Sequence, residues 1–206
     1  VTRLKELLDE KKYGEVFQVS IWTEQLTRYP ADHWASSKER LGGGQLFSHG
    51  CHYVDLLLWF LGRPIKGIHM GTNLGTPWME REGTSNVTLE FEQGRLGYHF
   101  GTWGARGTRL RYAIHAHCTE GMIEADITGS KLVHIHRGEE TLLLESESGK
   151  HTENEMAHFL DCIETGQQPL TDGHGSLQGL RVIWRLYEAE QEGRIADLTG
   201  LGLDEA

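Results

Sequence analysis

The sequence predicts an α+β domain built on an open, mainly antiparallel β-sheet that helices cover on one face. Two observations support this prediction. Between residues 65 and 148, seven strand-like segments follow one another with short turns and no helical pattern between them. Helical patterns lie on both sides of this run, at 45–61 before it and at 151–165 and 174–192 after it. Strands joined by short turns pair antiparallel, and helices at the ends of such a run pack on one face of the sheet.

The chain opens with a helical pattern that a strand follows. Leu4, Leu7 and Leu8 recur at helical spacing with charged residues between them, and Gly14 ends the pattern. The segment EVFQVSIW, residues 15–22, then alternates as a half-buried strand does. The chain starts without Met and directly in a helical pattern, which indicates that it begins inside a longer gene product.

Residues 23–44 are predicted to form a long loop. The segment is polar, contains Pro30 and ends in the triplet Gly42, Gly43 and Gly44. Loops of about 20 residues are uncommon inside compact domains and often carry function. The triplet allows two interpretations, because it serves either a tight entry into the next helix or the close approach of a flat ligand to the positive end of that helix.

The helix predicted at 45–61 is apolar around most of its circumference, which is typical of a buried helix. On a helical wheel, one narrow stripe is expected to face the core and a second apolar set lies on its flank. The stripe comprises Phe47, Cys51, Val54, Leu58 and Leu61, and the flank comprises Leu46, Tyr53, Leu57 and Phe60.

Three polar residues share another stripe of the same helix. Ser48, His52 and Asp55 line up with Trp59 about a quarter turn away from the core stripe. Burying a polar group without a partner costs about 1–3 kcal/mol, so these side chains must have partners or border a cavity. In a structural hypothesis, Asp55 holds the imidazole of His52 and both satisfy nearby backbone groups. In a functional hypothesis, the stripe lines a ligand site.

The later elements follow from alternation and periodicity. Glycine just past the last helical residue is the usual left-handed stop, and Gly166 and Gly193 hold that position for the last two helices. The seven strand-like segments cover residues 65–75, 84–92, 95–103, 108–118, 121–127, 131–137 and 140–147.

Composition argues against several classes of partner. The balance of 20 Lys and Arg against 30 Asp and Glu gives a net charge of −10, without a basic cluster, which argues against nucleic acid and anionic membranes. No apolar run approaches the roughly 20 residues that a membrane span needs. Cys51, Cys118 and Cys162 are odd in number and far apart, as is typical of reduced thiols. We therefore expect a cytoplasmic protein.

Two histidine pairs invite a metal hypothesis. His115 and His117 precede Cys118, and His134 and His136 form a second pair with the same spacing. Residues i and i+2 share a face of a strand, so each pair directs both rings the same way. On neighbouring strands, four imidazoles could converge on Zn²⁺ or a similar ion. No acidic ligand recurs with them, so an exposed or interface sheet face is favoured and no metal site is predicted.

Two long segments carry a family resemblance. The first comprises LLDEKKYGEVFQV and, after a Trp in the loop, GGGQLFSHGCHYVDLLLWFLG at residues 42–62. The second is EMAHFLDCIETGQQPLTDGHGSLQGLRVIWRLYEAEQEGRI at residues 155–195. Together they resemble the C-terminal domain of the Gfo/Idh/MocA family of NAD(P)-dependent oxidoreductases. The likeness covers nearly the whole chain, in order, but says little about the individual substrate.

The resemblance implies an architecture and a division of labour. The fold would be that of dihydrodipicolinate-reductase-like C-terminal domains, joined to an N-terminal Rossmann domain that binds NAD or NADP and supplies a catalytic Lys. Residues 1–13 would be the trailing helix of that nucleotide-binding half, and residues 14–206 the substrate-binding and oligomerisation domain. The family's catalytic histidine aligns with His52, which would assist proton transfer at the substrate hydroxyl while hydride passes to or from the nicotinamide.

The chain departs from the family pattern at three points. Ser48 stands where many of these dehydrogenases carry Asp, and a serine cannot act as a carboxylate base. Trp34-Ala35 replaces the family's Trp-Arg pair. The chain also lacks a GxGxxG between a strand and a helix, and it lacks Glu-Lys-Pro. We therefore expect no cofactor and no turnover with this chain alone.

The leading hypothesis is the substrate-binding and dimerisation domain of a dehydrogenase that acts on a sugar, cyclitol or related polyol. It predicts a homo-oligomer formed through the open sheet face. The alternatives are a standalone, non-catalytic binding or assembly module and a His-rich metal-binding protein. The residues assigned under the leading hypothesis are His52 as catalytic, Asp55 and Ser48 as supporting, Trp34, Lys38, Arg40 and His49 as substrate contacts, and Gly43 and Gly44 near the cofactor.

Overall fold

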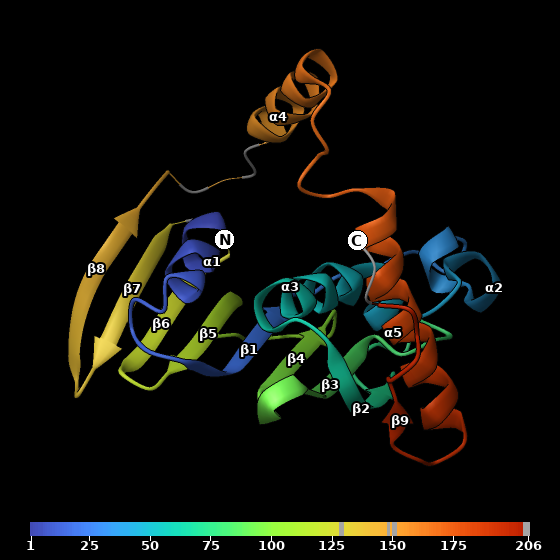
Figure 1. Cartoon of the computed structure of the whole chain (residues 1–206). Coiled ribbons are helices and arrows are strands. Elements are labelled where there is room, and N and C mark those ends of the chain that lie inside the picture. The colour runs from blue at the N-terminus through green and yellow to red at the C-terminus, as the bar shows by residue number, and fades with distance from the viewer. Residues whose placement is uncertain (128–129, 148, 150–151, 204–206) are drawn as a thin grey trace.

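The centre of the molecule is a single sheet of nine strands in the order β8-β7-β6-β5-β1-β4-β3-β2-β9 (Figure 1). The structure is a computed structural model and describes residues 1–127, 130–147, 149 and 152–203. The strands are β1 (Val16–Glu24), β2 (Pro64–Thr72), β3 (Thr84–Phe91), β4 (Leu96–Thr102), β5 (Tyr112–Cys118), β6 (Gly121–Asp126), β7 (Lys131–His136), β8 (Glu139–Glu145) and β9 (Ala196–Asp197). The predicted run of seven strands is confirmed as β2 to β8.

The predicted helices are also present. The helices of the structure are α1 (Thr2–Asp9), α2 (Lys38–Leu41), α3 (Cys51–Leu61), α4 (Thr152–Thr165) and α5 (Gly173–Gln191). Of these, only α2 lies in a segment that was predicted as loop. The glycine stops hold, because Gly166 and Gly193 both adopt positive φ, at 68° and 64°.

The sheet is antiparallel except for one pair of strands. Strand β1 pairs with β4 in parallel, from Gln18 opposite Leu96 to Glu24 opposite Thr102, and with β5 antiparallel on its other side. The chain reaches this arrangement because β1 is followed by the long loop and α3, after which β2, β3 and β4 add back toward β1 as a meander. The expectation of a mainly antiparallel sheet is confirmed, and β1 lies inside the sheet.

The main core lies between the sheet and helices α1, α3 and α5. Alternate strand residues such as Val19, Ile21 and Ile114 are fully buried on this face. Leu4 and Leu7 of α1 belong to the same core cluster. Figure 1 shows these helices on one side of the sheet, which confirms the α+β architecture with one covered face.

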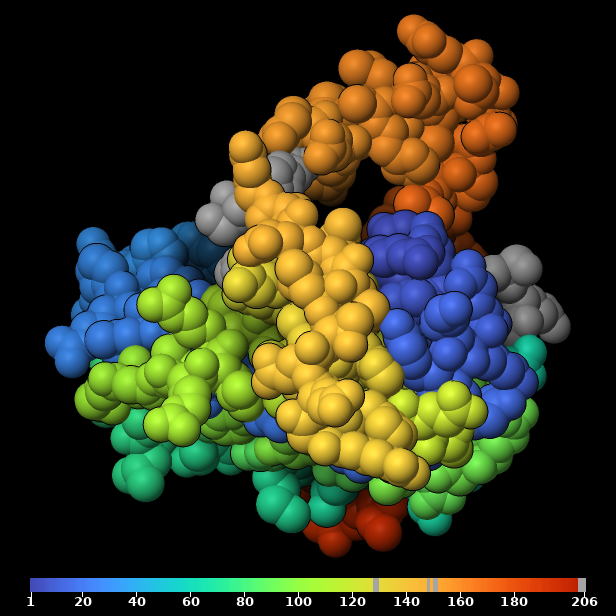
Figure 2. All heavy atoms as spheres, turned by 90° about the vertical axis from the view of Figure 1, so that its left-hand side faces the viewer, coloured from blue at the N-terminus to red at the C-terminus, as the bar shows by residue number. Residues whose placement is uncertain are grey.

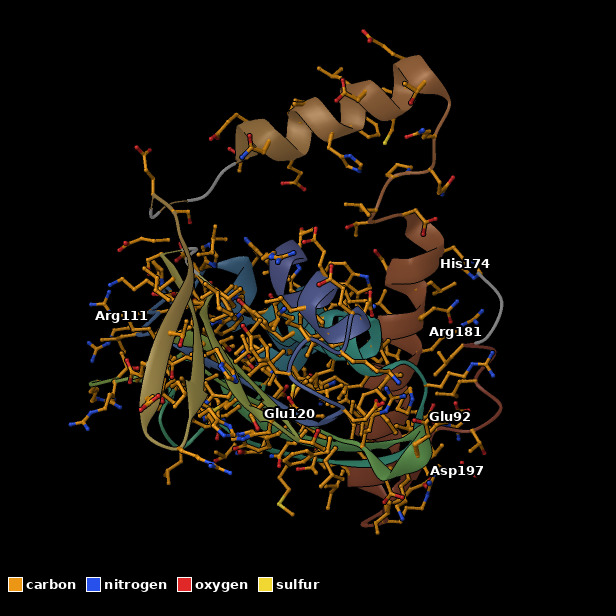
Figure 3. All side chains as sticks on the ribbon, turned by 60° about the vertical axis from the view of Figure 1, so that its left-hand side comes forward. Glu92, Arg111, Glu120, His174, Arg181 and Asp197 are labelled. Carbon is orange, nitrogen blue, oxygen red and sulfur yellow. The ribbon has the colours of Figure 1, made fainter. Side chains whose placement is uncertain are left out.

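Helix α4 stands apart from the helices that cover the sheet (Figures 1 and 3). It carries four large apolar side chains that are each at least half exposed: Met156, Phe159, Leu160 and Ile163. The C-terminal segment, by contrast, is fastened to α5, where Nη1 of Arg181 donates to the carbonyl oxygens of Leu201 and Gly202 at 3.2 and 2.9 Å (Figure 3).

The other face of the sheet is open. It exposes Ile68 and Met70 on β2 and Leu96 on β4, among polar neighbours. Figure 2, which looks at the β8 edge, shows the β7–β8 hairpin in front beside α1, with α4 projecting above. Within the described part of the chain, no helix combines the length and the apolar character that crossing a membrane requires.

Candidate functional site

The helix that carries the predicted polar stripe begins with a π-helical turn. Residues Leu46–Gly50 form this turn, and α3 continues directly from Cys51. Single π-turns are rare inside α-helices and occur often at functional sites. Because a π-turn holds more residues than an α-turn, it rotates the residues before it relative to those after it. A wheel drawn at a constant angle is therefore wrong across this segment.

The expected core stripe is accordingly only partly correct. Val54 and Leu61 are fully buried, but Phe47, Cys51 and Leu58 are half-buried. The residues predicted as a flank are, by contrast, all buried. They are Leu46, Tyr53, Leu57 and Phe60. Phe47 instead faces α5, where its ring centroid lies 5.1 Å from that of Trp184.

The polar stripe is less buried than expected. His52 is exposed, and Ser48 and Asp55 are half-buried. Burial raises the pKa of Asp55, and the neighbouring His52 partly opposes this change. The two side chains are thus close enough to interact electrostatically. His52 lies at the surface, where an incoming ligand can reach it.

His49 occupies the centre of a group of rings beside His52. Its Nε2 lies 3.5 Å from the Tyr53 hydroxyl, and its ring centroid lies 6.3 Å from that of His52. The rings of Trp103 and Tyr112 lie 6.4 and 5.8 Å away. His49 and His52, predicted to act together, are therefore neighbours.

Sequence reasoning missed the residues that surround His49. Tyr53 was assigned to packing only, while Trp103 follows β4 and Tyr112 begins β5. A usable signal was available, because both aromatic residues flank the same connection between β4 and β5, two strands in the middle of the sheet. Burial raises the pKa of both Tyr53 and Tyr112, so both hydroxyls stay protonated at neutral pH. The Tyr112 hydroxyl donates to Oε1 of Gln25.

The long loop is connected to this group of rings. Tyr29 stacks on His33 with centroids 4.5 Å apart, and it meets Trp103 edge-on at 5.9 Å. His33 lies beside Trp34, whose side chain is 52% exposed. A continuous series of ring contacts therefore leads from His49 to Trp34.

Lys38 and Arg40, the two loop residues predicted as cationic substrate contacts, lie on α2, and both are exposed. The backbone N–H of Lys38 donates to Oε2 of Glu80 at 2.7 Å. The role of Lys38 and Arg40 as substrate contacts stays a prediction.

Two glycines of the triplet are enclosed by the protein itself, whereas Gly42 is exposed. Gly43 and Gly44 are buried, and a Cβ atom on them would overlap Phe47 and the carboxylate of Glu82, respectively. The backbone N–H of Gly44 donates to the hydroxyl of Tyr187 at 3.1 Å. This geometry fits the hypothesis of a tight helix entry. The proximity of the two glycines to a cofactor stays a prediction.

A cavity of about 490 Å³ lies along the second half of the polar stripe. Asp55 and Trp59 line it from α3, and Asp172, Gly175 and Ser176 line it from the start of α5. The four members of the predicted stripe therefore divide into two groups. His52 lies beside the group of rings, whereas Asp55 and Trp59 border the cavity and Ser48 does not line it.

The two histidine pairs do not converge. Strand β6 separates β5 from β7, and the register places the pairs on opposite faces of the sheet. His115 lies on the open face, where its Nε2 is 2.9 Å from Oε2 of Glu124, whereas His134 stacks on Tyr13 on the helix face at 3.7 Å. No group of three or more metal-ligating side chains occurs in the ranges that the structure describes.

Comparison with known proteins identifies relatives of this arrangement. The family model described as "GFO/IDH/MocA C-terminal domain" matches residues 1–124. No curated protein matches the chain.

Three solved structures illustrate the fold similarity. An aldose-aldose oxidoreductase from Caulobacter crescentus, complexed with glycerol, is 22% identical with a TM-score of 0.80, over 94% of this chain and 59% of the other. An Agrobacterium radiobacter oxidoreductase in complex with NAD+, L-tartaric acid and magnesium gives 17% and 0.73, over 96% and 61%. A putative myo-inositol dehydrogenase from Sinorhizobium meliloti gives 19% and 0.75, over 96% and 61%. The chain thus spans about three fifths of the structures it resembles.

Proposed function

This chain belongs to the GFO/IDH/MocA family, whose C-terminal domain it matches, and on that premise we propose that it is the substrate-binding part of an NAD(P)-dependent oxidoreductase. The reaction moves hydride between the nicotinamide and a hydroxyl-bearing carbon of a sugar, cyclitol or related polyol. One observation carries the proposal. The exposed His52 lies beside a second histidine, which tyrosine and tryptophan rings surround. The long loop that bears Trp34 lies next to this group.

His52 is the proposed general acid and base. In the oxidative direction, it accepts the proton of the substrate hydroxyl as the C–H bond delivers its hydride to the nicotinamide. In the reductive direction it returns that proton. An imidazole suits this role because its ordinary pKa lies near neutral pH. Asp55 interacts electrostatically with His52 and is the proposed supporting residue. Ser48 is proposed to hydrogen-bond a substrate oxygen.

The loop and His49 are the proposed substrate contacts. Polyols combine apolar C–H faces with many hydroxyls, so they suit sites in which aromatic rings lie beside hydrogen-bonding groups. Trp34 offers a ring face, and Lys38, Arg40 and His49 offer hydrogen bonds. The glycerol in the Caulobacter structure is consistent with such a ligand in a relative.

The cofactor phosphates are proposed to bind elsewhere. NAD(P), when bound, supplies the hydride acceptor or donor. At the glycine triplet, the N–H groups of Gly44 and Phe47 already donate to Tyr187, and the carboxylate of Glu82 adds negative charge beside them. This helix start therefore suits phosphate poorly, although the nicotinamide ring, which is cationic when oxidised and neutral when reduced, is not subject to that repulsion. We assign the dinucleotide phosphates to a separate nucleotide-binding half. Residues 1–13 would be the trailing helix of that half, and residues 14–206 would form the domain that partners it.

We also propose self-association through the open face of the sheet. Ile68 and Met70 on β2 and Leu96 on β4 are exposed apolar positions on that face, with β3 between the two strands, and a second copy would cover them. The separation of the two histidine pairs leaves the metal-binding alternative without support from geometry.

The decisive experiment uses the longest natural reading frame that contains this chain. NAD(P) reduction is measured with a panel of sugars, cyclitols and linear polyols, for the unaltered protein and for His52→Gln. We expect kcat/KM to fall about 10²–10⁴-fold, the usual contribution of a general acid or base. His174→Gln, an exposed histidine at the start of α5 (Figure 3), should leave activity unchanged. Unchanged activity of His52→Gln refutes its role, and no activity with any substrate favours the non-catalytic binding module.

A further inference from the structure

The hydroxyl of Tyr187 lies at the start of the helix that carries the two site histidines. It accepts hydrogen bonds from the backbone N–H groups of Gly44 and Phe47, at 3.1 and 3.2 Å. It donates its own hydrogen to Oε1 of Glu82 at 2.5 Å. The first N–H groups of a helix lack partners within the helix, so one hydroxyl here satisfies two of them and is itself fully used.

Glu82 contacts the same helix start by two routes. Its carboxylate accepts from Tyr187, and its backbone carbonyl accepts from the N–H of Gln45 at 2.7 Å. Tyr187 belongs to α5, whereas Glu82 lies just before β3, so two distant parts of the chain meet at one helix end. Tyr187 is only 7% exposed, which excludes water as a substitute partner at most of its surface.

Gly44 has a specific steric reason to lack a side chain. A Cβ atom there would overlap the carboxyl group of Glu82. Its φ is not among the positive values, so the backbone conformation itself would tolerate alanine. The glycine is therefore required by the position of the Glu82 carboxylate and not by a left-handed turn.

The two N–H groups held by Tyr187 lie on either side of the start of the π-turn. Gly44 precedes Leu46–Gly50 and Phe47 lies inside it, so the geometry of the turn depends on this hydroxyl. His49 lies within the turn, and His52 follows it by two residues. The width of the turn fixes the direction of His49 relative to His52.

We propose that Glu82 and Tyr187 are positioning residues that hold the π-turn and thereby orient His49 and His52, with glycine at position 44 admitting the Glu82 carboxylate. The inference rests on the proposed function only for the chemical role of His52. The orientation itself is measurable without substrate or cofactor.

The first test is Tyr187→Phe in this chain, studied by NMR. The ring remains, but two N–H groups and one carboxylate lose their partner. We expect amide hydrogen exchange at Gly44 and Phe47 to accelerate roughly 10- to 100-fold, as expected for loss of buried hydrogen bonds. The imidazole signals of His49 and His52 should shift, while those of His134 and His136 on β7 stay unchanged.

Two further variants separate positioning from general destabilisation. Gly44→Ala should displace the Glu82 carboxylate and reproduce the shifts at His49 and His52. Glu82→Gln keeps an acceptor for the Tyr187 hydroxyl and should preserve the wild-type signals. As controls, Tyr98→Phe removes a hydroxyl bonded to Asn86 at 2.8 Å on the open face, and Gly107→Ala places a methyl group where no atom lies within 4 Å.

The outcomes are distinguishable. Unmoved His49 and His52 signals in Tyr187→Phe overturn the proposal, even where the protein is less stable. If Tyr187→Phe does not fold, Gly44→Ala decides by the same signals. Absence of oxidoreductase activity in the parent protein would refute the proposed function and leave this positioning intact. Unmoved histidine signals would refute the positioning and leave the proposed function intact.

Discussion

The imidazole of His99 stacks on the ring of Tyr53, with centroids 5.2 Å apart and planes inclined by 20°. His99 lies on β4 and Tyr53 on α3, so this contact joins the sheet to the helix of the candidate site. His99 is fully buried, and its Nε2 lies 3.1 Å from Oγ1 of Thr23. Burial, assisted by His49 and His69, lowers the pKa of His99 to about 3. The stacked ring is therefore neutral in the folded protein at physiological pH.

Burial of His99 predicts that the folded state loses stability as the pH falls below 6.5. The unfolded chain takes up a proton at His99 near its ordinary pKa of 6.5, and the folded chain does so only near 3. Between these values the unfolded state binds one proton more. This difference lowers the free energy of unfolding by about 1.4 kcal/mol per pH unit. Urea unfolding at several pH values within this window measures the slope.

The variant His99→Gln tests which group causes the slope. Glutamine keeps a polar partner for Thr23 but does not titrate, so we expect a slope about 1.4 kcal/mol per pH unit shallower than in the wild type. His174→Gln, at an exposed position, should keep the wild-type slope. Equal slopes for His99→Gln and the wild type would show that His99 is not the responsible group.

A second prediction concerns the sheet beneath the helix start. A Cβ atom on Gly101 would overlap the side-chain amide of Gln45, which is fully buried and lies 3.5 Å from Nδ1 of His49. Gln45 has little room to move away. We expect Gly101→Ala to lower the free energy of unfolding by about 1–3 kcal/mol, as overpacked cores do. Gly107→Ala, in an exposed loop, should change the urea midpoint little, and a similar midpoint for both variants would contradict the prediction.

The sequence was informative where structure is set by local pattern. The strands after Ile65 were found because alternation and short turns are local signals, and the ends of α4 and α5 were found because Gly166 and Gly193 stop helices in a known way. The site was found in part for the same reason. His52 and Asp55 lie on one helix, so their proximity required no knowledge of the rest of the fold.

Features that depend on distant contacts were not predictable. The π-turn at Leu46–Gly50 is hydrogen-bonded to Tyr187, which is 140 residues from Phe47 in the chain. The parallel pairing of β1 with β4 depends on the path of the chain through α3 and the meander. Trp103 and Tyr112 reach His49 only because that pairing brings their strands to the helix start. Sequence periodicity contains no information on contacts between residues that are far apart in the chain.

A third prediction tests self-association through the open face. Met70 is 62% exposed on that face, and a carboxylate placed there would be desolvated in a complex. We expect Met70→Glu to raise the dissociation constant of the homo-oligomer about tenfold or more, measured by sedimentation velocity. Leu74→Glu is the matched control, because Leu74 is 88% exposed in the loop that follows β2. A monomeric wild type, or equal behaviour of both variants, would count against this interface.

The last prediction concerns Asp55, whose pKa is raised above its ordinary value of 3.8 by burial. The folded chain therefore holds this proton more tightly than the unfolded chain. Stability is lost as the pH rises from 3.8 through the raised value, and the loss persists at neutral pH. Asp55→Asn carries no charge, so we expect it to unfold at a higher urea concentration than the wild type at neutral pH and at a similar concentration under strongly acidic conditions.

Activity should change in the opposite direction. The parent protein bearing Asp55→Asn should lose turnover, because His52 loses the neighbouring carboxylate that supports it under the proposed function. Asp32→Asn, in the exposed loop, controls for removal of a carboxylate and should alter neither property. A substitution that raises stability and lowers activity identifies a residue that serves function at a cost in stability. If Asp55→Asn instead destabilises the protein at neutral pH, the carboxylate serves as a structural partner of His52, and the structural hypothesis drawn from the sequence is correct.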